Sequence, residues 1–332
     1  MIEMPVFKEE NWYLDSVKSL LVDNRIKDDE KRIDNCNKKI RDISKSLNEI
    51  ICDEDFSIPN KQITLFEQVI LAPYKDLKRI HDRIDKDAEN IFYDHIEQEN
   101  GKIRRVIKRK WNAIYSLYDK FIKKGLNIKL IQKYGVKCCP YCNENYIINR
   151  YKNGSQSYAM GQLDHFYPRD KFPVFSMSLY NLIPSCGSCN HIKASNEITI
   201  SPHDHARNFS NLRISYVPKS SRWIDDADEI DVLFCYDESD VDFKNGMEKN
   251  LEVMGIKSSY NVHRDYIQEI LKKAQIYGQE ARSNLLNDFP ELFVSDDELI
   301  KVIFSNYIDE KDSLKRPLSK LTQDILKELN II

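Results

Sequence analysis

The stretch LDHFYPRDKFPVFSMSLYNLIPSCGSCNHIKASN, residues 163–196, decides the fold of this chain. Asp164 and His165 end a predicted β-strand, and Asn181 begins a second one. Asn190 lies at the start of a short predicted helix. The sequence therefore predicts two strands followed by a helix, with polar side chains at the points where these elements meet.

Two CxxC pairs belong to this region: CPYC at 139–142 precedes the stretch, and CGSC at 186–189 lies within it. Four thiolates suit tetrahedral Zn²⁺, and a closed set of four protein ligands is typical of a structural site. The alternatives are a redox-active CxxC, for which no βαβ context is predicted, and ordinary buried cysteines. Cys138 adjoins the first pair, but the two-residue spacing favours Cys139. The predicted structural zinc ligands are Cys139, Cys142, Cys186 and Cys189.

The polar residues, in this order and spacing, resemble the HNH endonuclease motif, and the CxxC pairs resemble its zinc-stapled subclass. The resemblance covers about 60 residues, from Cys139 to Asn196. It implies a ββα-metal core and hydrolysis of phosphodiester bonds in nucleic acid.

The resemblance also implies a role for each residue. Neutral His165 deprotonates the attacking water, since histidine titrates near a pKa of about 6.5. Asp164 and Asn190 offer oxygen ligands that suit a catalytic Mg²⁺ or Mn²⁺. Asn181 fixes the His-bearing loop by hydrogen bonds, and Lys193, one turn beyond Asn190, holds a phosphate. These five residues form the predicted catalytic set.

Other histidines lie nearby in the sequence. His191 is an alternative metal ligand, although Asn190 already fills the ligand position that the resemblance implies. His203 and His205 either reach the site, bind phosphate, or are surface histidines in a turn, and we expect the last.

Composition limits the remaining options. The chain has 332 residues, 41% of them hydrophobic and 31% charged, and no apolar run is long enough to cross a bilayer. The N-terminal residues lack the basic and apolar regions of a secretory signal, so we expect a cytoplasmic protein with reduced cysteines.

The formal net charge of −3 conceals two oppositely charged segments. Residues 102–137 contain twelve Lys or Arg and one acid, whereas residues 225–242 contain nine acids and no Lys or Arg. We expect the basic segment to bind nucleic acid and the acidic one to face a protein or solvent. The alternative for each segment is a charged face that contacts only solvent. The predicted nucleic-acid-binding residues are Arg104, Arg105, Lys108, Arg109 and Lys193.

The N-terminal region is predicted to be helical. Apolar residues recur every seven positions in two stretches, Ile26, Ile33, Ile40 and Leu47, then Leu77, Ile84 and Ile91. These stripes predict two amphipathic helices that pack as an antiparallel hairpin. A third helix is expected to begin at Asn100 and Gly101, with Ile103, Val106 and Ile107 on its apolar face.

Several further elements follow from the sequence. We expect a hairpin of 145–151 and 157–166 around a turn at 152–155, strands at 212–217 and 230–236, a helix at 247–286 broken near 255–259, and a final helix at 314–329. The predicted fold is α+β and mainly α-helical. Its regions are a helical hairpin and basic helix (1–135), the HNH core with its zinc knuckles (136–208), and a mixed, then helical partner region (209–332).

The run 251–286 and the ending 316–330 resemble the PtuB-like HNH subunits of Septu antiphage systems, some of which accompany retrons. This implies a role in antiviral defence and an ATPase partner of the ABC or SMC-like (PtuA-like) type. DNA is the favoured substrate, and RNA or tRNA is the alternative. The rival function is a catalytically inert, zinc-dependent binding or scaffold subunit. The expected docking seams are Ile33, Ile40 and Leu47, and Leu318, Leu321, Ile325 and Leu329.

Overall fold

The computed structural model describes residues 1–60, 62–152 and 156–332. About 52% of the chain is helical and the sheets are small and antiparallel, so the predicted α+β, mainly helical class is confirmed. The helices are α1 (Glu10–Ser19), α2 (Asp29–Leu47), α3 (Leu65–Leu71), α4 (Tyr74–Ile84), α5 (Ala88–Phe92), α6 (Arg109–Tyr115), α7 (Leu117–Lys123), α8 (Leu126–Tyr134), α9 (Gly187–Lys193), α10 (Val241–Val253), α11 (Ile256–Ser259), α12 (Arg264–Ile276), α13 (Gln279–Asp288), α14 (Asp296–Ile303) and α15 (Ser319–Glu328). The strands form the pairs β1 (Tyr93–Glu97) with β2 (Ile103–Ile107), β3 (Asn149–Lys152) with β4 (Gln156–Ala159), β5 (Gly161–His165) with β6 (Leu182–Cys186), and β7 (Leu212–Pro218) with β8 (Ile230–Tyr236).

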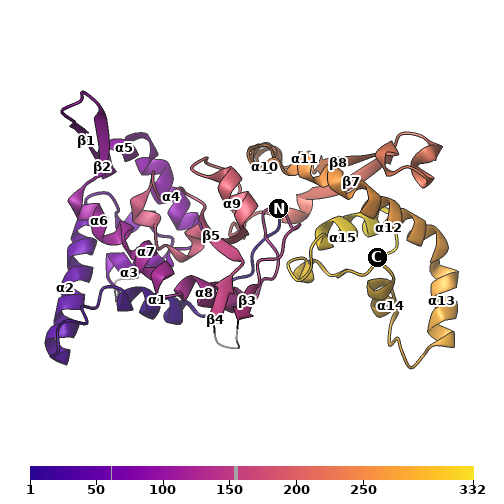
Figure 1. Cartoon of the computed structure of the whole chain (residues 1–332), viewed down its shortest axis with the longest axis horizontal. Coiled ribbons are helices and arrows are strands. Elements are labelled where there is room, and N and C mark those ends of the chain that lie inside the picture. Colours follow the sequence, from indigo (N-terminus) through magenta and orange to yellow (C-terminus); the bar gives the residue numbers. More distant parts are fainter. Residues whose placement is uncertain (61, 153–155) are drawn as a thin grey trace.

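Figure 1 shows an elongated molecule in which α1 to α8 lie on the left, α12 to α15 on the right, and α9, α10 and α11 between them. The N-terminal residues run between the two ends, where Ile2 N–H donates to the Pro140 carbonyl and Met4 N–H to the Pro202 carbonyl. One buried apolar cluster extends from Met1 to Leu326, so both ends share a core.

The first heptad stripe forms α2. Its N-terminus is capped by Asp28, whose carboxylate accepts the Lys31 N–H. Ile40 and Leu47 are buried, whereas Ile33 is 58% exposed because the N-terminal half of the helix leaves the core. The predicted hairpin with residues 77–91 is replaced by another packing, in which α2 lies mainly against α3 and α6.

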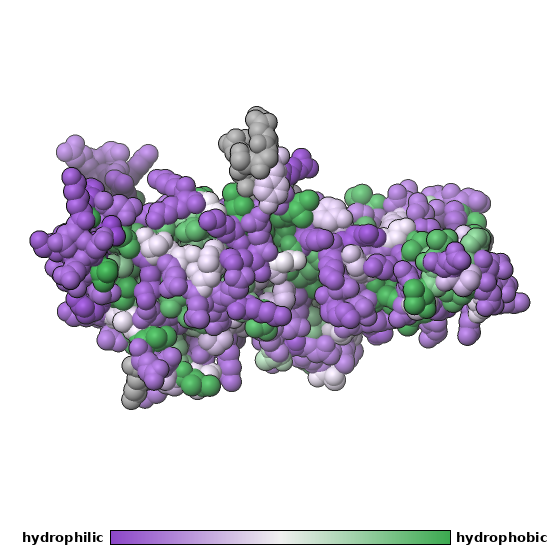
Figure 2. Space-filling model, turned by 90° about the horizontal axis from the view of Figure 1, so that it is seen from below, coloured by the Kyte–Doolittle hydropathy of each residue, from purple (hydrophilic) through white to green (hydrophobic). Residues whose placement is uncertain are grey.

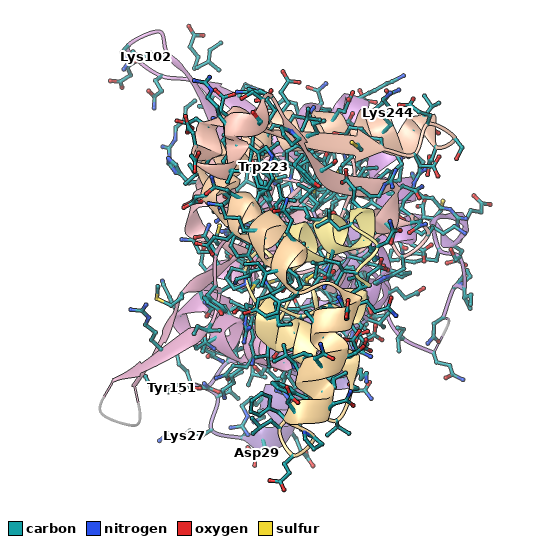
Figure 3. The ribbon with its side chains drawn as sticks, turned by 90° about the vertical axis from the view of Figure 1, so that its right-hand side faces the viewer. Lys27, Asp29, Lys102, Tyr151, Trp223 and Lys244 are labelled. Atoms are coloured by element: carbon teal, nitrogen blue, oxygen red, sulfur yellow. The ribbon has the colours of Figure 1, made fainter. Side chains whose placement is uncertain are left out.

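The predicted third helix is wrong over residues 103–107. These residues form β2, which pairs with β1 in the register Tyr93↔Ile107 to Glu97↔Ile103. The β-branched residues Ile103, Val106 and Ile107 favour a strand, and Gly101 adopts a positive φ of 74° in the turn. The hairpin projects from the molecule in Figure 1, and Figure 3 shows Lys102 near its tip. Helical structure begins again only at α6.

The hairpin predicted around 152–155 is confirmed in part: β3 pairs antiparallel with β4, but residues 161–165 of the expected second strand form β5, which pairs with β6 instead. Residues 153–155 of the expected turn lie outside the described ranges. Figure 3 shows Tyr151 on this hairpin as it extends away from the body of the molecule.

The C-terminal part contains the two predicted strands as β7 and β8, and α15 packs against β7. The expected break at Gly255 is present, with a positive φ of 63°, but a second break at Tyr277 and Gly278 separates α12 from α13. The final helix begins at Ser319 rather than Leu314.

The docking seam expected on the final helix is wrong. Leu321 and Ile325 have no exposed surface, and Leu318 and Leu329 pack against the core. The segment also supports the first zinc knuckle, since the Leu314 carbonyl accepts the N–H groups of residues 137 and 138. This face is therefore occupied within the chain.

The surface is largely hydrophilic on the face shown in Figure 2. Apolar side chains gather at the C-terminal end, where Phe289, Leu292 and Val294 are exposed. Across the described residues, every helix is too short or too polar to cross a membrane.

Candidate metal centre and ββα site

The ββα unit predicted from residues 163–196 is formed by β5, β6 and α9. β5 and β6 pair antiparallel from Gly161↔Cys186 to His165↔Leu182, and α9 packs on both strands. Gly161 is required at the start of β5, because a Cβ there would lie 3.0 Å from the Ile147 Cβ and 3.1 Å from the Ile147 carbonyl oxygen. Successive strand residues point to opposite faces, so Asp164 and His165 face different surroundings.

The four predicted zinc ligands come together. The Sγ atoms of Cys139, Cys142, Cys186 and Cys189 lie within 4.8 Å of one another, and all four residues are buried. This confirms the predicted convergence and leaves Cys138 outside the group. Four soft sulfur donors at this spacing fit a tetrahedral ion such as Zn²⁺.

Nearby N–H groups favour negatively charged sulfur at this centre. The Glu144 N–H donates to Cys142 Sγ and the Cys189 N–H to Cys186 Sγ, each at 3.4 Å. The Asn145 amide lies 3.7 Å from both Cys142 Sγ and Cys186 Sγ. Asn145 was not anticipated from the sequence, since only the fold places it between the two knuckles.

The second part of the chain supports the first knuckle. Asn143 has a positive φ of 57°, its amide donates to the Ser313 carbonyl at 2.9 Å, and its side-chain oxygen accepts the Lys320 N–H at 3.1 Å. The Tyr260 hydroxyl donates to the Cys142 carbonyl at 2.6 Å. The knuckle is thus fixed by residues more than a hundred positions away.

His165 lies at the end of β5, partly buried against Tyr118. Its Nε2 is 3.0 Å from the Ser176 carbonyl oxygen, which can only accept a hydrogen bond. Nε2 therefore carries the proton. Burial lowers the pKa of His165 to about 3, so the ring is neutral and its second nitrogen, Nδ1, has a free lone pair. Within the described ranges, Nδ1 makes no hydrogen bond.

Asn181 is fully buried beneath the loop that follows His165. Its side-chain oxygen accepts the Tyr167 N–H at 2.8 Å, and its amide donates to the carbonyls of Tyr167 at 3.2 Å and Phe175 at 3.1 Å. These bonds span the loop that ends at Ser176, the residue that orients the His165 ring.

Asp164 points to the opposite side, between β5 and α9. It is 2% exposed, and Oδ2 accepts the Tyr141 hydroxyl at 2.6 Å. Lys193 Nζ lies 3.2 Å from Oδ1 and from Oδ2, and donates to the His165 carbonyl at 2.7 Å. Burial raises the pKa of Asp164, and Lys193 opposes that shift. Lys193 itself is fully buried, so its ammonium is not displayed at the surface, where a phosphate would lie.

Asn190 is directed elsewhere. Its amide donates to the Gln162 side-chain oxygen at 2.6 Å, so Asn190 faces Gln162 while Asp164 faces Lys193. His191 is exposed on the outer side of α9. The two predicted ligands Asp164 and Asn190 are therefore each bonded to a different protein group, Lys193 and Gln162.

The expectation of surface histidines at 203 and 205 is wrong for His203. It is 2% exposed and packs between Tyr134 and Tyr180, and burial lowers its pKa to about 3. His205 is exposed and pairs with Glu3 at 2.6 Å. It lines a pocket of about 630 Å³, and none of Asp164, His165 and Asn190 lines that pocket.

The predicted nucleic-acid-binding residues lie on the β1–β2 hairpin and the residues after it. Arg104 and Arg109 are exposed. Arg105 is bound by Glu89 at 2.7 Å and lies 3.5 Å from the centre of the Tyr93 ring, and the Lys108 ammonium donates to the Asn90 carbonyl. Two of the four cations are therefore already engaged by the protein.

Arg169 was missed by the sequence reasoning. Its guanidinium lies 3.9 Å from the centre of the Tyr115 ring and binds Asp119 at 2.9 Å. It also lies 5.1 Å from the Tyr118 ring, which contacts His165. A positive charge therefore stands beside the histidine, contributed by the same loop that Asn181 fixes.

Comparison of the chain with protein-family models, curated proteins and solved structures gave no match.

Proposed function

We propose that this chain is an HNH-type endonuclease that hydrolyses phosphodiester bonds of nucleic acid, with His165 as general base. The observation that carries the proposal is the orientation of His165, whose Nε2–H is bound by the Ser176 carbonyl. A neutral ring fixed in this way presents Nδ1 as a proton acceptor. The ββα arrangement of β5, β6 and α9 around four cysteines agrees with the motif resemblance.

The chemistry assigned to His165 is the removal of a proton from water as the oxygen attacks phosphorus. The proton passes to Nδ1, the bond from phosphorus to the 3′ oxygen breaks with its electron pair staying on that oxygen, and the departing oxygen takes up a proton from solvent water to give the 3′-hydroxyl. Ser176 and Asn181 keep the ring and its loop in position throughout. Arg169 supplies positive charge on the side where a phosphate would approach.

Zinc at the four cysteines is proposed as a structural ion. It fits because all four donors are sulfur and each knuckle is completed by N–H groups directed at sulfur. When bound, it would join the segment before β3 to the N-terminus of α9.

A catalytic Mg²⁺ or Mn²⁺ at Asp164 and Asn190 does not fit the side chains as they stand. Both carboxylate oxygens of Asp164 are bound by Tyr141 or Lys193, and the Asn190 amide is bound to Gln162. A divalent cation would have to replace the Lys193 ammonium. The mechanism above therefore contains no step through such an ion.

The resemblance to Septu subunits extends the proposal to antiviral defence with an ATPase partner. The exposed apolar residues Phe289, Leu292 and Val294, and Ile33 on α2, offer contact surface for a partner protein. DNA is the favoured substrate, with RNA or tRNA as the alternative, because a histidine-activated water does not need a 2′-hydroxyl.

A second function, an inert zinc-dependent scaffold, is favoured by one observation. The buried Lys193 ammonium lies at Asp164, the position that the resemblance assigns to a catalytic cation. A scaffold needs the zinc centre and the outer surface but not the Nδ1 atom of His165. The two functions therefore differ in what a change at His165 does.

The deciding experiment compares nucleic acids from cells that express the wild type, His165→Ala, or the matched control His191→Ala, which changes an exposed histidine on α9. We expect cuts with 5′-phosphate and 3′-hydroxyl ends in the wild type and the control, and none with His165→Ala. A 2′,3′-cyclic phosphate would contradict the role given to His165. A biological effect that survives His165→Ala would establish the scaffold.

A further inference from the structure

A second cluster of metal-binding side chains lies outside the ββα site. His81 and Asp85, one turn apart at the end of α4, meet Glu197, which follows α9. Their nearest ligand atoms lie within 4.8 Å of one another. Among the described residues, this trio and the four cysteines are the groups with such a spacing.

The orientation of His81 leaves a buried nitrogen without a hydrogen bond. Its ring is 9% exposed and stacks on Tyr167, with ring centres 4.1 Å apart. Nδ1 lies 3.2 Å from an Asp82 carboxylate oxygen, which can only accept, so Nδ1 carries a proton. Nε2 is buried, forms no hydrogen bond, and points at the carboxylates of Glu197 and Asp85.

This arrangement is unfavourable for the neutral ring unless a cation binds at Nε2. In the neutral ring the Nε2 lone pair faces carboxylate oxygens 3.4 and 3.9 Å away, and a buried acceptor without a partner costs about 1–3 kcal/mol. Lys171 binds Glu197 at 2.7 Å and Lys78 binds Asp82 at 2.5 Å. Asp85 has no Lys or Arg partner within the described ranges.

The distances are close to those of a metal site. Ligands about 2.1 Å from a tetrahedral ion lie about 3.4 Å from each other, and His81 Nε2 lies 3.4 Å from Glu197 Oε2 and 3.9 Å from Asp85 Oδ1. Metal-bound histidines usually donate their other N–H to a carboxylate. In this chain the Asp82 carboxylate accepts that hydrogen bond from His81 Nδ1. One imidazole and two carboxylates suit Zn²⁺ or Mn²⁺ better than Mg²⁺, which prefers oxygen alone.

We propose that His81, Asp85 and Glu197 form a binding site for a divalent transition-metal cation, Zn²⁺ or Mn²⁺, separate from the four-cysteine centre. The partly exposed carboxylates leave room for water ligands. A bound ion ties α4 to the segment that leaves α9, beside Tyr167 of the loop that follows His165. The inference does not depend on nuclease activity.

The experiment uses the full-length chain with zinc retained at the cysteines and MnCl₂ as the probe, with free Mn²⁺ measured by electron paramagnetic resonance. The test variants are Glu197→Gln and Asp85→Asn, which keep the shape of partly exposed side chains. The matched control is Glu89→Gln, which removes a carboxylate 3.0 Å from His95. Within the described ranges, this pair has no third His, Cys, Asp or Glu close enough to complete a metal site.

We expect the wild type and Glu89→Gln to bind one more Mn²⁺ per chain than either test variant, with affinity at this site reduced about tenfold or more in the variants. Mn²⁺ should also raise the thermal midpoint of the wild type and the control alone. Equal Mn²⁺ binding by all four proteins, no binding by the wild type, or an equal loss in the control overturns the site. His81 is then an imidazolium paired with carboxylates.

Discussion

The Lys193 ammonium lies 3.2 Å from each carboxylate oxygen of Asp164, and both side chains are withdrawn from solvent between β5 and α9. A buried pair of this kind is costly to break, because the remaining charge has no solvent to stabilise it. The two residues were expected to act separately, one on a metal ion and the other on a phosphate. Their contact changes what each substitution should do.

Lys193→Met should therefore lower the free energy of unfolding by about 3–5 kcal/mol, since it leaves the Asp164 carboxylate buried and unpaired. Adding Asp164→Asn should recover part of that loss. Urea unfolding of the two single variants and the double variant measures the coupling. As a control, the same substitution at the surface pair Lys244 and Glu238 should cost far less, because solvent screens an exposed pair. Additive effects of Lys193→Met and Asp164→Asn would show that the buried contact does not form in solution.

Cys139→Ser should remove bound zinc and unfold the ββα unit, because the free energy of binding a structural ion is part of the free energy of folding. Cys138→Ser is the matched control, since Cys138 is buried next to Cys139 but lies outside the sulfur group. We expect it to retain one zinc per chain by elemental analysis. Zinc-free wild type with a native circular dichroism spectrum would argue against a metal at this centre.

The exposed cations of the β1–β2 region should set the salt dependence of nucleic-acid binding. Arg104→Gln with Arg109→Gln should reduce the slope of log K against log salt by about 1.8 for duplex DNA, at about 0.9 for each phosphate contact. Lys249→Gln with Lys257→Gln, which changes two exposed lysines on α10 and α11, away from the hairpin in Figure 1, is the control. An unchanged slope in the first variant would make the hairpin a solvated surface.

Buried His203 should make stability depend on pH. Its pKa is lowered to about 3 in the folded chain and is about 6.5 when unfolded, so protons bind the unfolded state first as pH falls. The contribution is present above about pH 6.5 and is lost between about 6.5 and 3. At pH 5 the loss is about 2 kcal/mol.

His203→Phe removes this titration while keeping an aromatic ring between Tyr134 and Tyr180. Urea titrations at pH 7 and pH 5 give the free energy of unfolding of each protein at both pH values. Between pH 7 and pH 5 this free energy should fall by about 2 kcal/mol less in His203→Phe than in the wild type. His205→Gln changes an exposed residue and should behave like the wild type. Equal pH dependence in all three proteins would mean that His203 is accessible to protons in the folded chain.

Much of the ββα unit was predictable from local sequence. The two CxxC spacings and the strand ending in Asp164 and His165 depend on neighbours only a few residues away, and they occur where expected. The helix expected to start at Asn190 is present but begins earlier, at Gly187. The strands β7 and β8 were predictable for the same reason, although their pairing was not part of the prediction.

Other predictions failed where two structures suit one pattern. Apolar residues at 103, 106 and 107 satisfy a helical face, but the same β-branched residues pair with β1 once Gly101 turns the chain back. The stripe on the last helix indicated an apolar face without naming its partner, and β7 covers that face. A pattern gives the side of an element that is buried, not the element that buries it.

Local sequence was enough to predict the short elements of the ββα unit and the four clustered cysteines, because spacing within a turn or strand fixes which side chains share a face. What each polar group contacts depended on the packing of the whole chain. That packing brought Lys193 to Asp164, Ser176 to His165, and Glu197 to His81. Such contacts depend on how separate elements pack, and the energy that fixes them comes from the whole buried core rather than from neighbouring residues.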